Sequence, residues 1–286
     1  MRRPATGGRR IGIVCNADHD VFRAVADGLR DHGHEVTFFH PGRPVPERDI
    51  DRLDLLANKK VSRAAVEALQ YAERTGVRTW NGYYAVLLGA RFVGLRALEA
   101  VGFRVPPAST TKPDCEYVVK SLVDWYGDGN PHLGGDGEVY QKYVPADPID
   151  DKYYAVDVGG EVRVRAVRAR SKLYGEKALL GTVDPDPALA AKTRALLRAV
   201  GAQALGVDVV HADGVAYAVD VNPAMSFRGV GMDEDLVESV LARLPATDAV
   251  VPDGDADATV RTCGGYSAET RSATSTTTRS STLPGS

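Results

Sequence analysis

The sequence predicts an α/β protein in which a small doubly wound domain precedes a two-part α+β region. Strand and helix patterns alternate over residues 10–82, which is typical of a parallel sheet covered by helices. Further on, the pairs Gly159-Gly160 and Asp213-Gly214 each join two runs that are rich in β-branched residues, as in antiparallel hairpins. A parallel sheet followed by antiparallel hairpins implies two differently built regions in one chain.

Composition and charge limit the class of protein. Of 286 residues, 44% are hydrophobic and 26% are charged, as in ordinary globular proteins. The net charge of −3 indicates neither a nucleic acid nor an anionic membrane as principal partner. No apolar run approaches the roughly 20 residues of a membrane helix, and residues 1–10 lack a signal peptide's apolar core, so we expect a cytoplasmic protein. Cys15, Cys115 and Cys263 are too widely spaced to indicate disulfides or a zinc cluster.

The first block of the chain begins with a polar lead-in over residues 1–9, which we expect to be disordered. Apolar runs then predict strands near residues 11–15, 35–39, 53–56 and 77–81, with helices over 21–29 and 64–74 between them. No G-x-G-x-x-G sequence follows the first strand, so a dinucleotide site of the Rossmann type has no support. A ligand of this domain would lie beyond the carboxyl ends of its strands.

The next block combines a helix with a short strand. Helical periodicity predicts one long helix over residues 83–101, and Tyr117–Lys120 reads as an apolar strand that ends in a lysine. Such a lysine either lies in solvent at the strand end or points into a cleft. Residues 124–137 hold five glycines without periodicity and predict a loop, which is either a lid whose amides bind phosphate or a plain connection.

Strand patterns continue over residues 138–145, 152–158 and 161–170, and helices are predicted over 187–205 and 233–244. The charged positions of the run 161–170 change phase around Ala166, which predicts a bulge or bend near that residue. Arg168 and Arg170 then either turn toward whatever the sheet covers or remain surface charges on an edge strand. Residues 246–286 are rich in Asp, Gly, Ser and Thr and are predicted to be disordered.

The hairpin of residues 206–221 holds the strongest candidate site. Asp220 and Asn222 are two positions apart on its second strand and therefore face the same side, while Asp208 lies on its first strand. Carboxylate and amide oxygens are the ligands that Mg²⁺ prefers, and open positions would accept water and phosphate. The same residues before Pro223 are also typical of local turn chemistry.

In this order, the motifs resemble those of the ATP-grasp superfamily, and the hairpin is similar to the metal-binding end of RimK-like carboxylate-amine ligases, in which the two acids are also 12 positions apart. The resemblance covers roughly residues 10–244 and implies that ATP lies between two sheets. It divides the chain into a pre-ATP-grasp domain (10–82), an ATP-grasp subdomain A (83–140) and a subdomain B with the metal site (141–245).

The resemblance also implies roles for individual residues. Lys120 would contact the ATP phosphates, and Asp208, Asp220 and Asn222 would hold Mg²⁺, or Mn²⁺ in its place. The remaining ATP-binding residues would be Arg91, Gln141, Lys142, Tyr143, Val144, Asp151 and Lys152, and the catalytic arginines Arg168, Arg170 and Arg228. Of these, Gln141, Tyr143 and Val144 would form the hinge whose backbone groups bind adenine. Three features depart from the family pattern: Asp220 replaces the usual Glu, Arg91 replaces a lysine, and the glycines after Lys120 are displaced.

Three functions are compatible with these residues. The first is an ATP-dependent ligase, in which a small-molecule or peptide carboxylate is phosphorylated and an amine attacks the acyl-phosphate. The second is a small-molecule kinase that resembles inositol-polyphosphate kinases, and the third is an inactive nucleotide-binding module. No nucleic-acid or membrane partner is expected, and an oligomer is left open. Asp220→Ala is expected to abolish turnover of Mg·ATP while leaving folding nearly intact.

Overall fold

A computed structural model of the chain describes residues 8–125, 129–176 and 178–244. The predicted tail over 246–286 and most of the predicted lead-in lie outside these residues. Arg9 is described, and its guanidinium contacts the Asp54 carboxylate at 3.2 Å while its backbone N–H donates to His34. The prediction that residue 9 is disordered was therefore wrong. Within the described ranges, no helix has both the length and the apolar character that crossing a bilayer requires.

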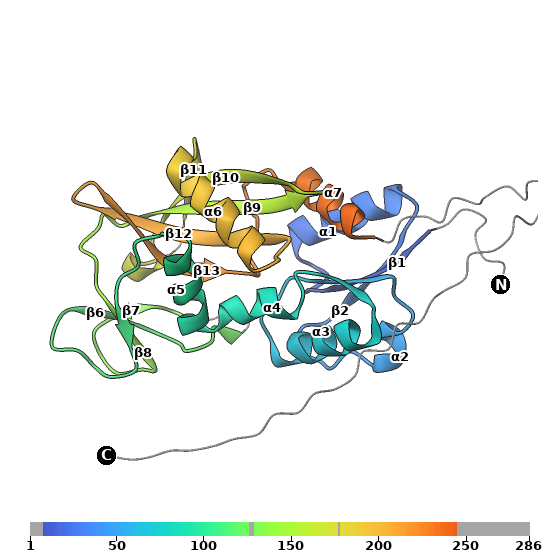
Figure 1. The fold of residues 1–286 in the computed structure, drawn as a ribbon, viewed down its shortest axis with the longest axis horizontal. Coiled ribbons are helices and arrows are strands. Elements are labelled where there is room, and N and C mark those ends of the chain that lie inside the picture. The colour runs from blue at the N-terminus through green and yellow to red at the C-terminus, as the bar shows by residue number, and fades with distance from the viewer. Residues whose placement is uncertain (1–7, 126–128, 177, 245–286) are drawn as a thin grey trace, which may run out of the picture. The chain divides into compact units, whose positions relative to one another are not determined.

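The N-terminal region forms a parallel four-stranded sheet in the order β2-β1-β3-β4. Its strands are β1 (Arg10–Val14), β2 (Glu35–Phe39), β3 (Leu55–Asn58) and β4 (Arg78–Trp80), and its helices are α1 (Asp20–Asp31), α2 (Glu47–Ile50) and α3 (Arg63–Thr75). Adjacent residues of β3 face opposite sides: Leu55 joins the core that contains α1, and Leu56 joins the core that contains α3. This is the predicted doubly wound domain (Figure 1).

The single long helix predicted over residues 83–101 was wrong. The segment forms α4 (Tyr83–Val86), a 3₁₀ turn η1 (Leu87–Gly89) and α5 (Arg91–Ala100). Ala90 is extended between them and forms an isolated bridge with Val123, and the backbone N–H of Arg91 donates to Leu122 O at 2.7 Å. Pairing with a segment 30 residues away in the chain interrupts the helix, which helical periodicity does not reveal.

Two antiparallel sheets make up the rest of the described chain. The smaller one has the order β5-β8-β6-β7, with β5 (Ala108–Ser109), β6 (Tyr117–Lys120), β7 (His132–Leu133) and β8 (Val139–Lys142). The larger one has the order β11-β10-β9-β12-β13, with β9 (Ile149–Val158), β10 (Glu161–Arg170), β11 (Leu179–Val183), β12 (Ala204–Ala212) and β13 (Val215–Asn222). The additional elements are η3 (Lys172–Tyr174), α6 (Pro187–Ala199) and α7 (Asp233–Arg243).

Strand β10 has no bulge at Ala166 itself, but an irregularity of the kind predicted near that residue lies two residues further along the strand. It pairs with β9 without interruption from Glu161 to Arg170, and its only register shift is against β11, between Arg168 and Ala169. Ala166 and Val167 are both buried because each face of the sheet is covered there: Ala166 belongs to the core with α6, and Val167 to the core with α7. The change of phase thus reflects burial on two sides rather than an inserted residue.

Two other boundaries differ from the predictions. Helix α6 ends at Ala199, and Gly201 has a φ of 64°, so the predicted extension to residue 205 instead begins β12 at Ala204. The glycine-rich segment 124–137, predicted as a loop, contains β7, which pairs with β6; its residues 126–128 lie outside the described ranges.

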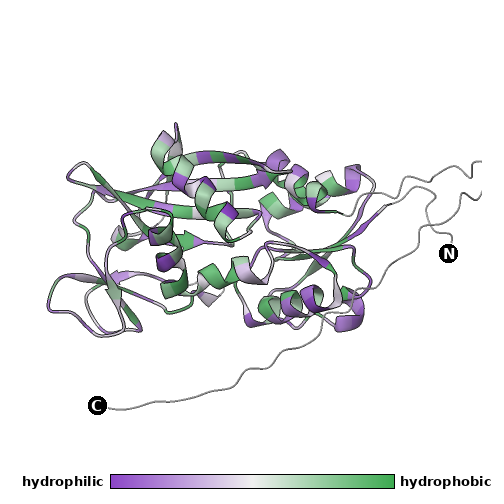
Figure 2. Ribbon diagram, viewed as in Figure 1, coloured by the Kyte–Doolittle hydropathy of each residue, from purple (hydrophilic) through white to green (hydrophobic). Residues whose placement is uncertain are grey.

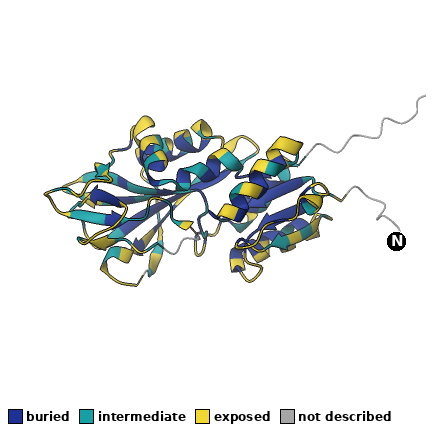
Figure 3. Ribbon diagram, turned by 90° about the horizontal axis from the view of Figure 1, so that it is seen from below, coloured by how far each residue is buried: buried dark blue, intermediate teal, exposed yellow. Residues whose placement is uncertain are grey.

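Hydrophobic residues predominate in many of the strands, and the helices combine hydrophobic with hydrophilic residues (Figure 2). Buried residues concentrate in the strands and on the inner helix faces, while the outer helix faces and loop tips are exposed (Figure 3). One core continues from α1 and the parallel sheet through α7 into β9 and β10, because Met232 and Leu236 pack with Phe22 and Tyr154 in the same cluster. This shared core fixes the parallel sheet beside the five-stranded sheet, with a cavity at their junction.

Candidate functional site

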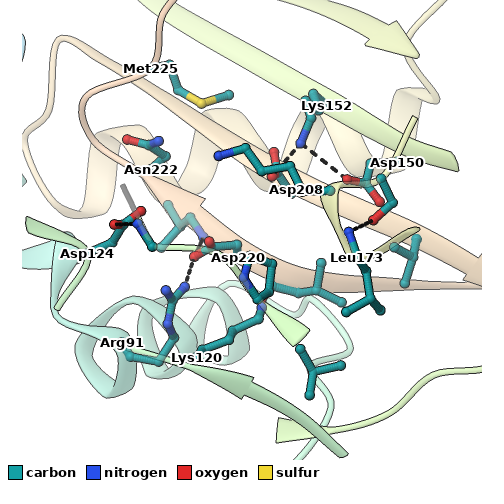
Figure 4. A pocket seen from close by; sticks show the side chains of 18 of the residues that line it. Arg91, Lys120, Asp124, Asp150, Lys152, Leu173, Asp208, Asp220, Asn222 and Met225 are labelled. Atoms are coloured by element: carbon teal, nitrogen blue, oxygen red, sulfur yellow. Dashed lines mark hydrogen bonds and ion pairs between the residues drawn. The ribbon is translucent and has the colours of Figure 1, made fainter. Parts of the chain in front are cut away.

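A cavity of about 520 Å³ lies between the two antiparallel sheets and reaches the carboxyl end of the parallel sheet. Strand β6 contributes Lys120, β9 contributes Lys152, and the hairpin of β12 and β13 contributes Asp208, Asp220 and Asn222. Figure 4 shows that these side chains lie around one space. The structure therefore brings the central predicted site residues together.

The β12–β13 hairpin sets the positions of both acids. Its turn residues Asp213 and Gly214 have φ values of 50° and 74°, which is the left-handed geometry of a tight two-residue hairpin. In the resulting register Asp208 lies directly opposite Asp220. The register then shifts by one residue, so that Val219 has no partner in the ladder. Its carbonyl instead accepts a hydrogen bond of 2.7 Å from Nζ of Lys120, which links the two sheets across the cavity.

Asp220 forms an ion pair with the buried Arg91 at the start of α5. Burial alone would raise the pKa of Asp220, but the charges of Arg91 and Lys120 outweigh it and lower the pKa below the ordinary value. Helix α5 can approach β13 closely because residue 94 is glycine: a Cβ there would lie 2.5 Å from Cγ1 of Val221. Gly94 thus permits the contact that carries Arg91 to Asp220.

Asp208 has its own cation. Nζ of Lys152 lies 2.5 Å from Asp208 Oδ2 and 3.4 Å from Asp150 Oδ2. Burial disfavours the charge of Lys152, but the two carboxylates outweigh this and raise its pKa above the ordinary value. Asp150 shows the opposite balance, because burial raises its pKa despite the neighbouring lysine. This trio of charged groups forms one side of the cavity in Figure 4.

The hydrogen bond of the Lys120 ammonium goes to a backbone carbonyl and not to a carboxylate of the protein, so its charge can bind the anionic group of a ligand. Its side chain points into the cavity and not into solvent, which decides between the two alternatives that its position in the sequence allows. Burial lowers its pKa to about 8; Asp220 partly offsets this effect and Arg91 adds to it. An incoming group of high negative charge would raise the pKa of this lysine again and stabilise its protonated form.

No protein-family model matches the chain, and no curated protein matches its sequence. Solved structures do match. The ATP-grasp ligase PsnB, solved with a phosphomimetic variant of its minimal precursor, Mg and ADP, aligns with a TM-score of 0.59 at 15% identity, covering 83% of this chain and 99% of that one. The RimK domain ATP-grasp protein of Sphaerobacter thermophilus aligns with a TM-score of 0.59 at 16% identity over 81% and 99%.

A third match is N5-carboxyaminoimidazole ribonucleotide synthetase from Thermotoga maritima, with a TM-score of 0.63 and 14% identity over 83% of this chain and 76% of that one. The chain has the ATP-grasp fold. This confirms the resemblance in the order of motifs at the level of the fold.

The oxygen atoms of the hairpin fit the Mg²⁺ ion that the ATP-grasp fold implies. Nζ of Lys152 donates a hydrogen bond to Asp208 Oδ2. The Arg91 guanidinium and the Val221 N–H both donate to Asp220 Oδ1. Asp208 Oδ1 and Asp220 Oδ2 accept no hydrogen bond from the described residues, so an oxygen of each acid remains for an ion. Asn222 Oδ1 already accepts the Ala224 N–H at 2.7 Å, which is the turn chemistry that the sequence left open.

Mg²⁺ commonly uses one or two carboxylates and completes its shell with water and phosphate oxygens, which matches this sparse donor set. The described residues contain no group of three or more His, Cys, Asp or Glu side chains that could hold a metal ion.

The strand predicted to contact adenine also lines the cavity. Gln141, Lys142, Tyr143 and Val144 all reach it. The backbone N–H groups of Lys142 and Tyr143 donate to Pro107 O and Glu116 O, whereas that of Val144 donates to no described residue. The Tyr143 hydroxyl lies 2.7 Å from the Tyr174 hydroxyl, which ties this strand to η3. Their adenine-binding role stays a prediction.

Three predicted site residues do not reach the cavity. Asp151 is adjacent to Lys152 on β9 and therefore faces the opposite side of the sheet, where Arg168 contacts it at 2.9 Å and Nε2 of His211 at 3.3 Å. Arg170 lies two positions beyond Arg168 on β10, and neither arginine lines the cavity. The structure thus corrects their placement, because period-two alternation turns this set away from Asp208. The third predicted arginine, Arg228, does line the cavity.

Several cavity residues were missed by the sequence analysis. His19, Lys59 and Lys60 come from the carboxyl end of the parallel sheet, and Asp150 comes from the start of β9. His19 lies in the loop between β1 and α1, and Lys59 and Lys60 directly follow β3. A doubly wound sheet binds its ligands beyond these strand ends, so the position of the three residues in the sequence carried a usable signal.

Proposed function

We propose that the chain is an ATP-dependent, ADP-forming ligase that joins a carboxylate to an amine. The observation that carries the proposal is the convergence of Lys120, Lys152 and Arg91 with Asp208 and Asp220 on one cavity between the antiparallel sheets. Cations alone would suit many anions, but cations beside free carboxylate oxygens suit a triphosphate that arrives with its own Mg²⁺, or with Mn²⁺ as an alternative.

The proposed reaction has two steps. An oxygen of the acceptor carboxylate attacks the γ-phosphorus, the bond between that phosphorus and the β–γ bridging oxygen breaks, and ADP leaves. The amine then attacks the acyl carbon, the bond to the phosphate oxygen breaks, and inorganic phosphate leaves while the nitrogen loses a proton. Lys120 and Lys152 would neutralise the charge on the transferring group, and the enclosed cavity would exclude water from the acyl-phosphate. The PsnB structures, which hold Mg and ADP, support this use of the fold.

The substrates would be a small molecule or a peptide. Structures of PsnB with its precursor peptide and of the macrocyclase MdnC with its precursor peptide MdnA support a peptide, whereas D-alanine–D-alanine ligase from Bacillus anthracis supports a small molecule.

The alternative functions each have one supporting observation. A kinase is favoured by the additional cations Lys59, Lys60 and Arg228 that line the cavity, because they suit a phosphorylated acceptor. An inactive nucleotide-binding module is favoured by the ion pairs of Asp208 with Lys152 and of Asp220 with Arg91, which an incoming metal ion must compete with.

One experiment separates the three functions. The protein is incubated with Mg·ATP, a pool of carboxylic acids and a pool of amines, and ADP, free phosphate and phosphorylated products are quantified. A ligase releases ADP and phosphate together, and only when both pools are present. ADP with a phosphorylated product identifies a kinase, and saturable ATP binding without turnover identifies the inactive module. Lys120→Met, which removes a cavity cation, should raise the ATP concentration required, while Lys192→Met outside the cavity should not.

A further inference from the structure

A group of basic side chains lines the cavity on the side of the parallel sheet, away from the predicted nucleotide contacts. It consists of Lys59 and Lys60 after β3, His19 before α1, and Arg228 after β13, and we refer to it as the basic cluster. The groups lie close together. The pKa of His19 falls to about 4, mainly because this residue is buried, and the charges of Lys59, Arg228 and Lys60 lower it further.

The backbone places this cluster at the switch point of the parallel sheet. β1 pairs in parallel with β2 on one side and with β3 on the other. Successive strands are therefore added on one side of β1 up to β2 and on its other side from β3 onward, which makes the gap between β1 and β3 the switch point. The Lys59 N–H donates to Val14 O and extends the β1–β3 ladder by one residue. The buried Asn58 then binds both the N–H and the carbonyl of Lys60, which fixes the turn that follows β3. Crevices at such switch points are the usual ligand sites of doubly wound sheets.

Lys59 is a buried ammonium without a carboxylate partner among the described residues. It is only 5% exposed, and its Nζ donates to Ala224 O at 2.6 Å. Burial lowers its pKa to about 8; the Cys15 thiol opposes this effect, and Lys60 and Arg228 add to it. A buried charge of this kind is costly unless a counter-ion is present, which suggests that one arrives with the ligand.

The charges that line the cavity are divided unevenly. Every carboxylate in its wall belongs to the segments from β6 to β13: Asp124, Asp147, Asp150, Asp208 and Asp220. The parallel sheet contributes Lys59 and Lys60 and no acid to that wall. Arg228 already has a partner, since its guanidinium contacts the Asp20 carboxylate at 2.8 Å. Among the described residues, the cation of this cluster that has no carboxylate contact and is almost fully buried is therefore Lys59.

The basic cluster also borders the proposed metal ligands. Ala224 accepts the hydrogen bond from Lys59 through its carbonyl and donates its N–H to Asn222. One residue therefore connects the buried lysine to the hairpin that faces the phosphates. An anion bound at Lys59 would lie beside the end of the nucleotide at which the reaction takes place.

We propose that the basic cluster binds an anionic group of the acceptor substrate, a carboxylate or a phosphate, with Lys59 as its principal contact. The inference rests on the proposed function, because it assigns the acceptor to the part of the cavity that the nucleotide leaves open. Lys59 and Lys60 orient the acceptor through this group and thereby select acidic acceptors over neutral ones.

The test measures anion binding by isothermal titration calorimetry with the nucleotide position filled by saturating Mg·AMP-PNP. Succinate and inorganic phosphate are titrated separately into the wild type, Lys59→Met and Arg228→Gln. Lys192→Met is the matched control, because it removes the same charge from α6, where Nζ packs over Phe103 outside the cavity. We expect at least one anion to bind, Lys59→Met to weaken it by about tenfold or more, Arg228→Gln to weaken it less, and the control to leave it unchanged.

The affinity for Mg·AMP-PNP is measured first in each protein, which separates the two proposals. If the wild type binds no nucleotide, the proposed function fails, and the anion titrations are repeated without nucleotide. If the nucleotide binds and neither anion does, or if Lys59→Met binds both anions as the wild type does, the basic cluster is not an acceptor site. Equal loss of nucleotide and anion binding in Lys59→Met would show that Lys59 acts only structurally, through its hydrogen bond to Ala224. Arg228→Gln leaves that hydrogen bond intact and therefore tests anion binding by the basic cluster independently.

Discussion

Replacing Asp220 by alanine should destabilise the protein as well as abolish Mg·ATP turnover. The sequence alone suggests that folding would survive nearly unchanged, but the structure places Arg91 in an ion pair with this acid. Arg91 is 8% exposed, and its other side-chain hydrogen bond is a long one of 3.4 Å to Ser121 O. Without Asp220, a buried guanidinium would remain beside the half-buried ammonium of Lys120 with no carboxylate in contact.

The size of the effect follows from the burial of the two partners. Breaking a fully buried ion pair from one side costs about 3–5 kcal/mol. The side chain of Asp220 is 34% exposed, so solvent screening reduces the expected loss in unfolding free energy to about 2–3 kcal/mol. For a protein of this size, that corresponds to a fall of roughly 5–10 °C in the melting temperature. The double variant Arg91→Met/Asp220→Ala should recover most of the loss, because it leaves neither charge unpaired.

Thermal and urea unfolding at pH 7 without nucleotide would measure these differences. The pH dependence provides a second check, because the pKa of folded Asp220 lies below the ordinary 3.8. Its stabilising contribution is complete above that ordinary value and is lost as the pH falls through the folded pKa. The stability gap between wild type and Asp220→Ala should therefore be constant near neutral pH and narrow below about 4. A single variant within about 0.5 kcal/mol of wild type, or a double variant no more stable than the single one, would refute the reasoning.

Three further predictions concern residues around the cavity. The lysine pKa falls from 10.5 in the unfolded chain to about 8 at both Lys120 and Lys59, so stability should rise with pH between these values, and it should rise less in Lys120→Met, which keeps only the Lys59 contribution; parallel urea-midpoint curves from pH 7 to 10.5 would contradict this. Gly94→Ala places a Cβ 2.5 Å from Val221 Cγ1 and 2.7 Å from Leu88 O, which should cost about 1–3 kcal/mol and weaken Mg·ATP binding, and Val221→Ala in the same chain should relieve only the first of the two clashes; unaltered ATP titrations would count against the contact. Asn81→Ala should lose about 3–5 kcal/mol, because this side chain binds the N–H groups of Gln203 and Ala204 and the carbonyls of Ala204 and Pro223 at 2.7–2.9 Å. Asn81 has a left-handed φ of 52°, so a loss in Asn81→Gly of similar size assigns the effect to the hydrogen bonds, and a small loss in both variants would disprove their importance.

Local sequence patterns determined the elements and the faces of the strands. Period-two alternation was enough to put Asp220 and Asn222 on one side of β13, and the Asp213-Gly214 turn was enough to form the hairpin that sets Asp208 opposite Asp220. The strand Tyr117–Lys120 was predicted with its observed bounds. These features depend on residues close together in the chain, which a sequence displays directly.

Contacts between distant segments decided the rest. Val123 interrupts the helix at Ala90, and cores on both faces of β10 bury Ala166 and Val167 together. The alternation along β9 puts Asp151 and Lys152 on opposite faces, although the sequence analysis gave both an ATP-binding role. The tertiary structure decides that the face with Lys152 is the one that lines the cavity.

The partners of the site residues are likewise invisible in the sequence. Arg91 and Asp220 are 129 positions apart, and Lys59 and Ala224 are 165 positions apart, so no periodicity connects them. Folding brings these groups out of water, and their pKa values and the cost of removing either one follow from that burial. The sequence thus determined which side chains share a strand face, and the tertiary structure determined which of those faces closes over a cavity and which charges meet inside it.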